Sequence, residues 1–393
     1  MGNVGALKRI LFCEGNTDGT IGGSHFILFS HVTELDQTRF DPVIVFHQPN
    51  RIADQLISLG FQVHSFELPT TLLRNAPRFV RWPAYLIRNL LWPTLRIYRF
   101  LSQHRIDLVH LNNTIEHSHI WIAGAFLAGI PCFSHERSHI PNFGSMARFF
   151  APRLKRIICV SNAVENNLHN QGIGRLLTEV IHDGIDPAMV KTVRSPAAIR
   201  AELSLPPDCP VVGIVGNIKH WKGQAVVVEA MSILHASIPN LKCLLIGATA
   251  SVDRDYEQSL RQRIADFGLQ DSVFITGYKQ DPYDYMNSLD IVIHASIEPE
   301  PFGMVVVEAM SLCKPVVASN AGGPRETVLD GETGMLFTPG NAQELAAVLS
   351  QLLADPTRRQ AMGKAGLARV KEVFHIDLNR NKTIALYDRF LND

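Results

Sequence analysis

The stretch from Asp290 to Pro339, DIVIHASIEPEPFGMVVVEAMSLCKPVVASNAGGPRETVLDGETGMLFTP, decides the fold class. It contains three short apolar runs typical of buried strands, IVIHAS, PVVAS and GMLF, and a helical segment that starts near Gly303. Strands that alternate with helices favour βαβ units and a parallel sheet. The stretch therefore predicts an α/β domain.

The same alternation runs through the rest of the chain and occurs twice. The first half contains the runs RILFC, PVIVF, VHSF, DLVHL and IICV, and the pattern restarts at Val211 with VVGIV, CLLIG and SVFIT. A chain of 393 residues exceeds what one hydrophobic core usually organises, so two domains are expected. Between them lies a polar stretch, Ile181 to Pro210, punctuated by prolines such as Pro187 and Pro196, which is typical of a linker or hinge.

Ligands of open α/β sheets bind outside the carboxyl ends of the strands. Two such sheets that face each other would place two substrates in the crevice between them. The chain pattern therefore predicts a ligand-binding cleft between the two domains.

Composition and charge exclude several classes. Lys plus Arg equals Asp plus Glu at 37 each, which gives no general reason to expect nucleic acid as a partner. The six cysteines form no C-x-x-C pair and are expected to be buried free thiols in a reducing compartment. The first apolar run is broken by Glu14, unlike a signal peptide, and the stretch Ile120 to Phe133 is too short to cross a bilayer. These features predict a cytoplasmic protein without a membrane span.

Two glutamates, Glu300 and Glu308, flank the expected start of the helix near Gly303. The backbone N–H groups around Phe302 to Met304 should face a ligand there, and a helix N-terminus suits an anionic diphosphate. Glu308 lies about one and a half turns into the helix, where its carboxylate can accept both hydroxyls of a ribose. The bland alternative is a solvated acidic loop before an ordinary core helix.

A second glycine turn disfavours that alternative. Gly322 and Gly323, followed by Glu326, form a tight turn beside the same strand ends. Two tight turns at neighbouring strand ends indicate a ligand site at this edge of the sheet.

The block resembles the nucleotide-sugar site of glycosyltransferase family 4, because the Glu300 and Glu308 spacing, the EAM and PVV runs and the GG-x-x-E turn all match. The resemblance implies a GT-B fold, with two Rossmann-like domains whose parallel sheets face an interdomain cleft. It implies an acceptor-binding domain over 1–185, a nucleotide-sugar domain over 186–374, and a helix at about 375–393 that returns to the first domain. It further implies that Glu300 holds the transferred sugar, and that the donor contacts Pro301, Phe302, Gly303, Met304 and Val305.

A possible phosphate clamp lies upstream, in VVGIVGNIKHWKGQ. Gly216 and Lys222 resemble the family's G-R-x-x-x-x-K-G motif, but Asn217 stands where arginine is usual. Either Lys219 or the amide of Asn217 is expected to replace that arginine, and a solvated lysine at a helix start is the alternative interpretation of Lys222. No G-K-[ST] tripeptide follows, so the segment is not a P-loop.

The first half offers a candidate acceptor side. Gly22 and Gly23 sit between the first strand and the first helix, where backbone amides can approach a phosphate or sugar. His135 matches a histidine that the family places near the sugar in transfer, and Arg137 follows it; a structural histidine is the alternative. His135 and His139 also match the zinc motif H-E-x-x-H, but that motif requires a helix, and a proline two residues later leaves no room for one.

The segment from Leu72 to Arg105 carries seven arginines among aromatic residues and has no acidic residue. This pattern suits a membrane surface with anionic lipid. A core-facing helix with a solvated basic face is an equal alternative, RNA binding is a lesser one, and Pro83 and Pro93 break any single long helix.

The resemblance thus implies a retaining, metal-independent glycosyltransferase that needs no cofactor. Its donor is expected to be UDP-glucose, with GDP-sugars as the open alternative, and its acceptor a glycan or lipid-linked intermediate of a surface polysaccharide. The catalytic set is expected to be His135, Glu300 and Lys222. Rival hypotheses are a nucleotide-sugar epimerase of the same fold, a zinc hydrolase using His135 and His139, and a catalytically silent nucleotide-binding protein. The expected location is the cytoplasm, with peripheral contact at the inner membrane face.

Overall fold

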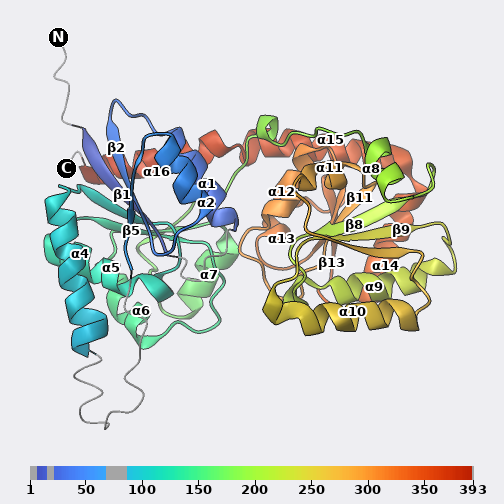
Figure 1. The fold of residues 1–393 in the computed structure, drawn as a ribbon, viewed down its shortest axis with the longest axis horizontal. Helices are drawn as coiled ribbons and strands as arrows, with labels where there is room; N and C mark the ends of the chain where they lie inside the picture. Colours follow the sequence, from blue (N-terminus) through green and yellow to red (C-terminus); the bar gives the residue numbers. More distant parts are fainter. Residues whose placement is uncertain (1–6, 16–21, 68–85, 392–393) are drawn as a thin grey trace, which may run out of the picture. The chain divides into compact units, whose positions relative to one another are not determined.

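The computed structural model describes residues 7–15, 22–67 and 86–391, and it divides the chain into two compact units. Unit 1 comprises Met1–His182 together with Arg380–Asp393, and unit 2 comprises Asp183–Asn379. Both units are drawn as ribbons in Figure 1.

Unit 1 is built on a parallel sheet that has seven strands among the described residues, in the order β3-β2-β1-β4-β5-β6-β7. The strands are β1 (Lys8–Glu14), β2 (Phe40–Phe46), β3 (Gln62–Ser65), β4 (Leu108–Leu111), β5 (Cys132–Glu136), β6 (Arg156–Cys159) and β7 (Thr178–Val180). The helices are α1 (Gly23–Thr33), α2 (Arg51–Ser58), the π-helix η1 (Ile87–Leu91), α4 (Trp92–Gln103), α5 (Ile115–Ala128), α6 (Ser145–Phe150), the 3-10 turn η2 (Ala151–Arg153) and α7 (Asn162–Asn170).

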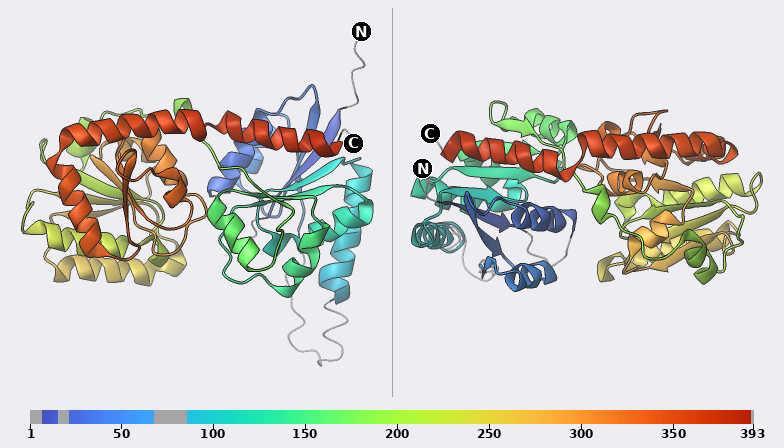
Figure 2. Two further views of the ribbon diagram at one scale, coloured as in Figure 1. Left: turned by 180° about the vertical axis from the view of Figure 1, so that it is seen from behind. Right: turned by 90° about the horizontal axis from the view of Figure 1, so that it is seen from above.

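Helices cover both faces of this sheet, as β1 shows. Successive side chains of a strand point to opposite faces. The Phe12 ring packs against His31 of α1 and Tyr387 of the C-terminal helix α16 (Ile376–Leu391). The Cys13 thiol instead contacts His47, which accepts a hydrogen bond from Trp121 of α5. The last part of the chain therefore completes the core of unit 1, and α16 can be followed in red in Figure 2.

Unit 2 is built on a second parallel sheet, with six strands among the residues described and the order β10-β9-β8-β11-β12-β13. Its strands are β8 (Val211–Val215), β9 (Lys242–Ile246), β10 (Val273–Gly277), β11 (Ile291–His294), β12 (Val316–Ser319) and β13 (Gly334–Phe337). Its helices are α8 (Pro196–Glu202), α9 (Gln224–His235), α10 (Arg254–Asp266), α11 (Pro282–Asn287), α12 (Met304–Ser311), α13 (Pro324–Thr327), α14 (Ala342–Ala354) and α15 (Pro356–Val373), with 3-10 turns η3 (Pro187–Met189), η4 (His220–Lys222) and η5 (Ser251–Asp253).

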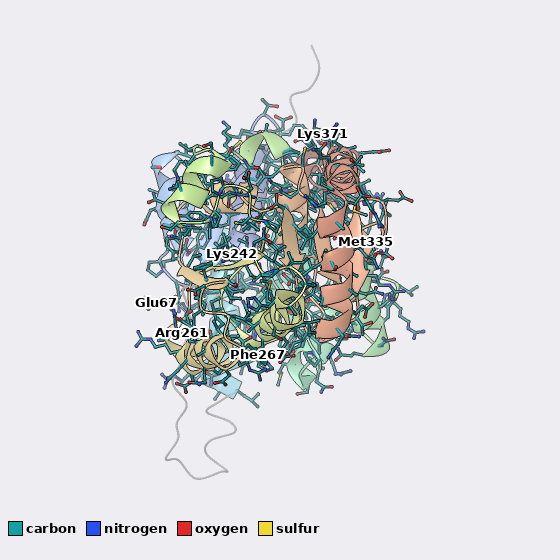
Figure 3. All side chains as sticks on the ribbon, turned by 90° about the vertical axis from the view of Figure 1, so that its right-hand side faces the viewer. Glu67, Lys242, Arg261, Phe267, Met335 and Lys371 are labelled. Atoms are coloured by element: carbon teal, nitrogen blue, oxygen red, sulfur yellow. The ribbon has the colours of Figure 1, made fainter. Side chains whose placement is uncertain are left out.

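The central strand of unit 2, β11, again separates two helical layers. Ile291 and Ile293 join the apolar cluster that contains residues of α9, α10 and α14. The outer face of α10 carries charged side chains such as Arg261, which pairs with Glu257 one turn earlier and is labelled near Phe267 in Figure 3. The opposite residues of β11, Val292 and His294, point to the other face of the sheet. His294 therefore lies away from the α9 cluster and at the carboxyl edge of the sheet.

The proline-rich stretch expected to link the two domains is largely packed on unit 2. Asp284 of α11 is buried and accepts hydrogen bonds from the backbone N–H groups of Val193 and Arg194 and from the Arg194 side chain. Pro196 starts α8, whose Arg200 pairs with Asp290. Polar residues of this stretch thus have partners in unit 2, and the role of the stretch as a hinge or linker stays a prediction.

All six cysteines are free thiols, as expected, and five of them are buried. Cys313 is the exception and is exposed. It follows the end of α12 with a φ of 56°, a left-handed conformation typical of helix C-termini. The expectation that every cysteine is buried is therefore wrong at this one turn.

Candidate functional site

The loop from β11 to α12 carries Glu300 at the carboxyl end of the central strand of unit 2. The loop ends at Gly303, whose φ of 86° lies in the left-handed region that favours glycine. A Cβ atom there would also lie 2.9 Å from Cγ of Pro324. Helix α12 starts at the next residue, Met304, in agreement with the expected start near Gly303. Phe302 and Gly303 are buried, whereas Pro301, Met304 and Val305 are half-buried.

The Gly322–Gly323 turn packs directly against this loop. A Cβ atom on Gly322 would lie 2.2 Å from the carbonyl oxygen of Glu300, and one on Gly323 would lie 2.3 Å from Cα of Phe302. The backbone N–H of Gly323 donates to the Glu300 carbonyl at 2.8 Å. The two glycines therefore fix the backbone that carries the Glu300 carboxylate.

Replacing Gly323 with alanine is expected to lower the free energy of unfolding by about 1 to 3 kcal/mol, because the new methyl group overpacks the loop. Urea unfolding measures the effect. Gly22→Ala is the matched control, because a Cβ atom on Gly22 meets no other atom within 4 Å. Equal unfolding midpoints for the two variants would contradict the close contact between the turn and the loop.

Lys222 reaches the same loop from a 3-10 turn after β8. The turn ends at Gly223, where a Cβ atom would lie 1.9 Å from the carbonyl oxygen of Ala295. The Trp221 carbonyl accepts a hydrogen bond of 2.8 Å from the backbone N–H of Ile297. This close approach of two backbone segments brings the Lys222 ammonium group to the Glu300 carboxylate. Because Lys222 forms this largely buried ion pair, the alternative that it is a solvated lysine is wrong.

Glu300 is the centre of a hydrogen-bond network in unit 2. Lys222 Nζ donates to Oε1 at 2.8 Å and to Oε2 at 2.9 Å. His294 Nε2 lies 2.7 Å from Oε2, and Ser296 Oγ donates to the same oxygen at 2.8 Å. The Glu300 and Lys222 side chains are only 12% and 17% exposed, so the ion pair is largely withdrawn from water.

The charge state of Glu300 follows from these partners. Burial by itself raises the pKa of the Glu300 carboxyl, but the charges of His294 and Lys222 and their hydrogen bonds hold this pKa well below its ordinary value. A carboxylate that stays ionised in a partly dry pocket accepts hydrogen bonds and donates none. Glu300 is therefore suited to hold hydroxyl groups.

Glu308 has a different environment, a little more than one turn after the start of α12 at Met304. Burial raises the pKa of its carboxyl to about 7, against the opposing effects of the Lys222 charge and a hydrogen bond from Tyr283. The pKa of the Tyr283 phenol is raised by burial and by the negative charge of Glu308. The carboxyl groups of Glu300 and Glu308 thus differ in protonation at neutral pH. Tyr283 of α11 is the hydrogen-bond partner of Glu308.

The remaining residues of the expected phosphate clamp line the turn after β8. Gly216 has a φ of 149°, and a Cβ atom there would lie 4.0 Å from Cε of Lys222. Asn217 is exposed, and its backbone carbonyl accepts from the side chain of Gln224. Lys219 is half-buried and forms no ion pair within the described part of the chain. Both candidates for the missing arginine thus flank Lys222 in one turn.

The acceptor-side candidates lie in unit 1. His135 is the fourth residue of β5 and is only 2% exposed; its Nδ1 lies 3.2 Å from the Arg137 guanidinium, and its Nε2 has no hydrogen-bond partner in the described structure. The His135 ring packs beside His110. Gly22 caps the exposed start of α1, and Gly23 is the first residue of that helix. The structure therefore places His135 in the protein interior and the two glycines at the surface.

The H-E-x-x-H motif does not have the geometry of a zinc site. His135 belongs to strand β5, whereas His139 lies in the irregular segment after it, so the two imidazoles do not share a helix face. Over the described ranges, no three His, Cys, Asp or Glu side chains gather as metal ligands would. The motif does not form a helix because it begins within β5, which pairs with β4 and β6 in the sheet.

Two family models divide the chain between them. Residues 21–189 match the model described as Glycosyltransferase Family 4, and residues 196–369 match the model described as Glycosyl transferases group 1. The chain belongs to the glycosyltransferases. This family and the two parallel sheets confirm the resemblance inferred from the sequence and the GT-B fold that it implied.

Curated relatives of this glycosyltransferase include enzymes named for surface polysaccharides. The chain is 27% identical to the lipopolysaccharide core biosynthesis mannosyltransferase LpsB of Rhizobium meliloti, over 54% of this chain and 61% of that protein. It is 28% identical to the capsular polysaccharide biosynthesis glycosyltransferase CapM of Staphylococcus aureus, over 47% of each chain. The matches thus span about half to three fifths of these relatives' length.

A solved structure resembles the glycosyltransferase over nearly its whole length. HepE of Anabaena in complex with UDP is 27% identical, covers 97% of this chain and 100% of its own, and has a TM-score of 0.82. HepE has also been solved with UDP-glucose, at a TM-score of 0.80.

Several polar residues of the glycosyltransferase site were not identified from the sequence. His294 and Ser296 contact the Glu300 carboxylate, and Tyr283 contacts that of Glu308. In unit 1, burial raises the pKa of the Glu136 carboxyl to about 7, against hydrogen bonds from Ser134 and the backbone N–H of Ile115. His294 and Ser296 do have a sequence signal, because a histidine and a serine at the end of an otherwise apolar strand mark its carboxyl edge.

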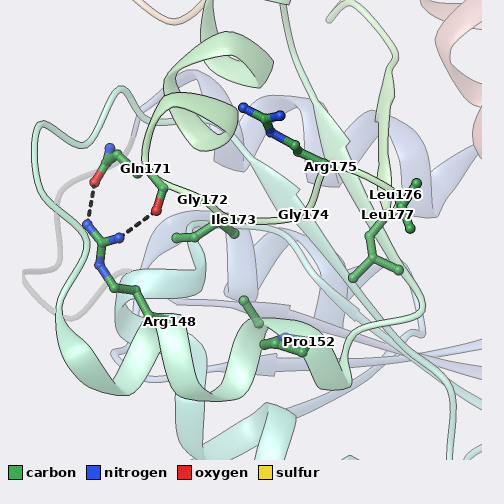
Figure 4. Close-up of a pocket in the computed structure, with 10 residues that line it drawn as sticks. Arg148, Pro152, Gln171, Gly172, Ile173, Gly174, Arg175, Leu176 and Leu177 are labelled. Carbon is green, nitrogen blue, oxygen red and sulfur yellow. Dashed lines mark hydrogen bonds between the residues drawn. The ribbon is translucent and has the colours of Figure 1, made fainter.

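Unit 1 also has a shallow hollow away from the strand ends that carry these residues, drawn in Figure 4. Arg148 of α6 crosses one side of it and donates to the carbonyl and side-chain oxygens of Gln171. Gly172, Gly174 and the exposed Leu176 also line it. None of the helices in the described ranges is both long and apolar enough to cross a membrane.

Proposed function

We propose that the protein is a retaining hexosyltransferase that moves glucose from UDP-glucose to a glycan or lipid-linked acceptor during surface polysaccharide biosynthesis. The observation that carries this proposal is the arrangement of Glu300, Lys222 and Glu308 at the start of α12. UDP-glucose is favoured because HepE, similar over 97% of this chain, was solved with it. The names of LpsB and CapM support a polysaccharide acceptor.

The donor is proposed to bind across the start of α12. In this binding mode the backbone N–H groups of Met304 and Val305 face the diphosphate, because the first N–H groups of a helix lack partners within it. Glu308 accepts the ribose hydroxyls, and Glu300 accepts hydroxyls of the hexose. Gly216 and Asn217 lie on the diphosphate side, next to Lys222.

Transfer is proposed to occur on the face of the sugar that the diphosphate leaves. The acceptor oxygen bonds to the anomeric carbon as the bond from that carbon to the diphosphate oxygen breaks. The acceptor proton passes to the departing diphosphate oxygen. Lys222 and the helix amides stabilise the negative charge that develops there, so this route requires no divalent metal ion.

The first unit is proposed to bind the acceptor through Gly22, Gly23, His135 and Arg137. The burial of His135 sets a condition on its role, since the imidazole must reach the surface to touch a sugar. His135→Asn distinguishes contact from support: a lower kcat with an unchanged unfolding midpoint supports contact, whereas a lower unfolding midpoint with unchanged kcat supports a structural histidine.

A pH dependence follows from the raised pKa of Glu308. Ribose hydroxyls donate to the ionised carboxylate, so affinity for UDP-glucose is expected to be full above pH 7 and to fall as the pH drops through about 7. Calorimetry with UDP-glucose measures this, because a diphosphate esterified at both ends does not titrate near neutrality. The Glu308→Gln variant should lose the transition, and a wild-type affinity that is flat between pH 6 and 8 would contradict the ribose role.

We also propose that unit 1 touches the inner face of a membrane containing anionic lipid. The part of the segment Leu72 to Arg105 that precedes residue 86 lies outside the described residues. Helix α4 buries Ile97 and Leu101, yet exposes apolar side chains on its outer face, such as Trp92 and Leu95, beside Arg96 and Arg99. An apolar face flanked by arginines complements an anionic bilayer better than it complements water.

Replacing Arg99 with alanine is expected to weaken binding to phosphatidylglycerol-containing vesicles about fivefold, for a loss of about 1 kcal/mol per arginine at the surface. Co-sedimentation with vesicles measures the partition. Arg254→Ala is the control, because Arg254 is an exposed arginine of unit 2. Equal partition into phosphatidylcholine vesicles with and without phosphatidylglycerol would contradict the proposed contact.

A donor screen tests the proposed function itself. The protein is incubated with UDP-glucose, other UDP-sugars and GDP-sugars, and release of UDP or GDP is measured with and without added glycan acceptors. Release of UDP from UDP-glucose supports the donor assignment. Turnover of a GDP-sugar alone would overturn it, and conversion of UDP-glucose to an epimer without acceptor would favour the epimerase.

A further inference from the structure

Lys222 has two duties that compete. In the structure its ammonium group bridges both oxygens of Glu300, at 2.8 and 2.9 Å. In the proposed function the same group stabilises the diphosphate. Moving Lys222 toward the diphosphate would leave a largely buried carboxylate without its cation, which is costly unless other donors hold it.

His294 and Ser296 supply those donors. We propose that His294, supported by Ser296, is a positioning residue that holds Glu300 in place and lets Lys222 turn to the donor diphosphate. His294 ends β11, is only 3% exposed, and lies 2.7 Å from Oε2 of Glu300 through Nε2. This inference rests on the proposed function, because it assigns a further residue to the same donor site.

The hydrogen bonds divide the two oxygens of Glu300 between protein and ligand. Among the described residues, Oε2 accepts from three groups, Lys222, His294 and Ser296, whereas Oε1 accepts from Lys222 alone. Each carboxylate oxygen offers about two acceptor positions. When Lys222 leaves, Oε2 remains held by two side chains and Oε1 becomes available. His294 and Ser296 therefore fix which oxygen meets the sugar hydroxyls.

The polar contacts of His294 point to this role rather than to general packing. Its Nδ1 is buried and forms no hydrogen bond to any described residue. Its Nε2 lies 2.7 Å from Glu300 Oε2 and 3.3 Å from Ser296 Oγ. Lys222 and His294 both lower the pKa of Glu300 through charge and hydrogen bonds, against the effect of burial.

A double-mutant cycle on UDP affinity tests the inference, because UDP has no sugar for Glu300 to bind. His294→Phe is expected to weaken UDP binding about tenfold, since the unsupported Glu300 retains Lys222. Glu300→Gln alone should change UDP affinity by less than about twofold. The double variant should bind UDP as well as Glu300→Gln does, because a neutral side chain no longer competes for Lys222.

A conservative variant gives a second readout. His294→Gln keeps an N–H donor near Oε2 and is expected to recover most of the UDP affinity lost in His294→Phe. Unfolding midpoints of all variants are measured in parallel. If His294→Phe does not fold, His294→Asn replaces it in the cycle, since asparagine is polar but too short to reach Oε2.

The possible failures are distinguishable. If the double variant binds UDP as weakly as His294→Phe, or if His294→Phe binds UDP as tightly as the wild type, the inference is overturned. If the wild type binds neither UDP nor GDP, the proposed function fails instead.

Discussion

Replacing Lys222 with alanine is expected to lower kcat/KM for UDP-glucose by about 10²- to 10³-fold, the usual cost of removing one group that stabilises charge in a transition state. The reason is the position of the ammonium group, which lies within 2.9 Å of both Glu300 oxygens and borders the turn at Gly216. Initial rates of UDP release at subsaturating UDP-glucose measure the loss. Most of the loss should appear in kcat, because the negative charge on the diphosphate grows as its bond to the sugar breaks.

Two further lysine variants make this experiment specific. Lys364→Ala removes an exposed lysine of α15 and should leave kcat/KM within about twofold of the wild type. Lys219→Ala decides what replaces the family arginine: a large loss assigns this role to Lys219, and no loss assigns it to Asn217. A Lys222→Ala variant as active as Lys364→Ala would contradict the diphosphate role of Lys222.

Replacing Glu308 with alanine is expected to weaken UDP binding by about 1.5 to 3 kcal/mol, for the loss of charge-assisted hydrogen bonds to the ribose. Glu308 lies on α12 with Tyr283 as its hydrogen-bond partner, so its carboxylate is already oriented before the nucleotide arrives. Isothermal titration calorimetry with UDP at a pH above 7 measures the change.

Glu298 provides the matched control for this loop. It is exposed and lies two residues before Glu300, so Glu298→Ala should leave the affinity for UDP unchanged. If UDP binds the Glu308→Ala variant as tightly as it binds the Glu298→Ala variant, the assignment of the ribose to Glu308 is contradicted.

The local parts of the donor site could be predicted from the sequence because they are encoded by short-range patterns. The strand ending near Ser296, the proline-rich turn and the helix starting at Met304 follow one another within a few residues. Gly322 and Gly323 were predicted as a tight turn, and the structure adds the reason, which is the close approach of the Glu300–Phe302 backbone.

The partners of the site residues could not be predicted in the same way, because tertiary packing selects them. Glu300 meets Lys222 across 78 positions of sequence, since Gly223 has no side chain where it approaches Ala295. Tyr283 meets Glu308 from a different helix. No periodicity or composition reports such contacts between separate elements.

Buried partners add information that the polarity of a segment does not give. The proline-rich stretch was predicted as a hinge or linker, and the structure adds that Asp284 and Asp290 pair with its arginines Arg194 and Arg200. The ring of His135 is buried beside His110, and its place near a sugar stays a prediction. In both regions the sequence shows that the residues are polar, whereas only the fold shows which groups they contact.

The most direct test of the donor site is a crystal structure of the protein with UDP. We expect the ribose hydroxyls to lie within hydrogen-bond distance of the Glu308 carboxylate. We expect the diphosphate to lie at the start of α12, with Lys222 turned from Glu300 toward it. Nucleotide bound at any other place, or at this place with Glu308 away from the ribose and Lys222 still on both oxygens of Glu300, would contradict this expectation.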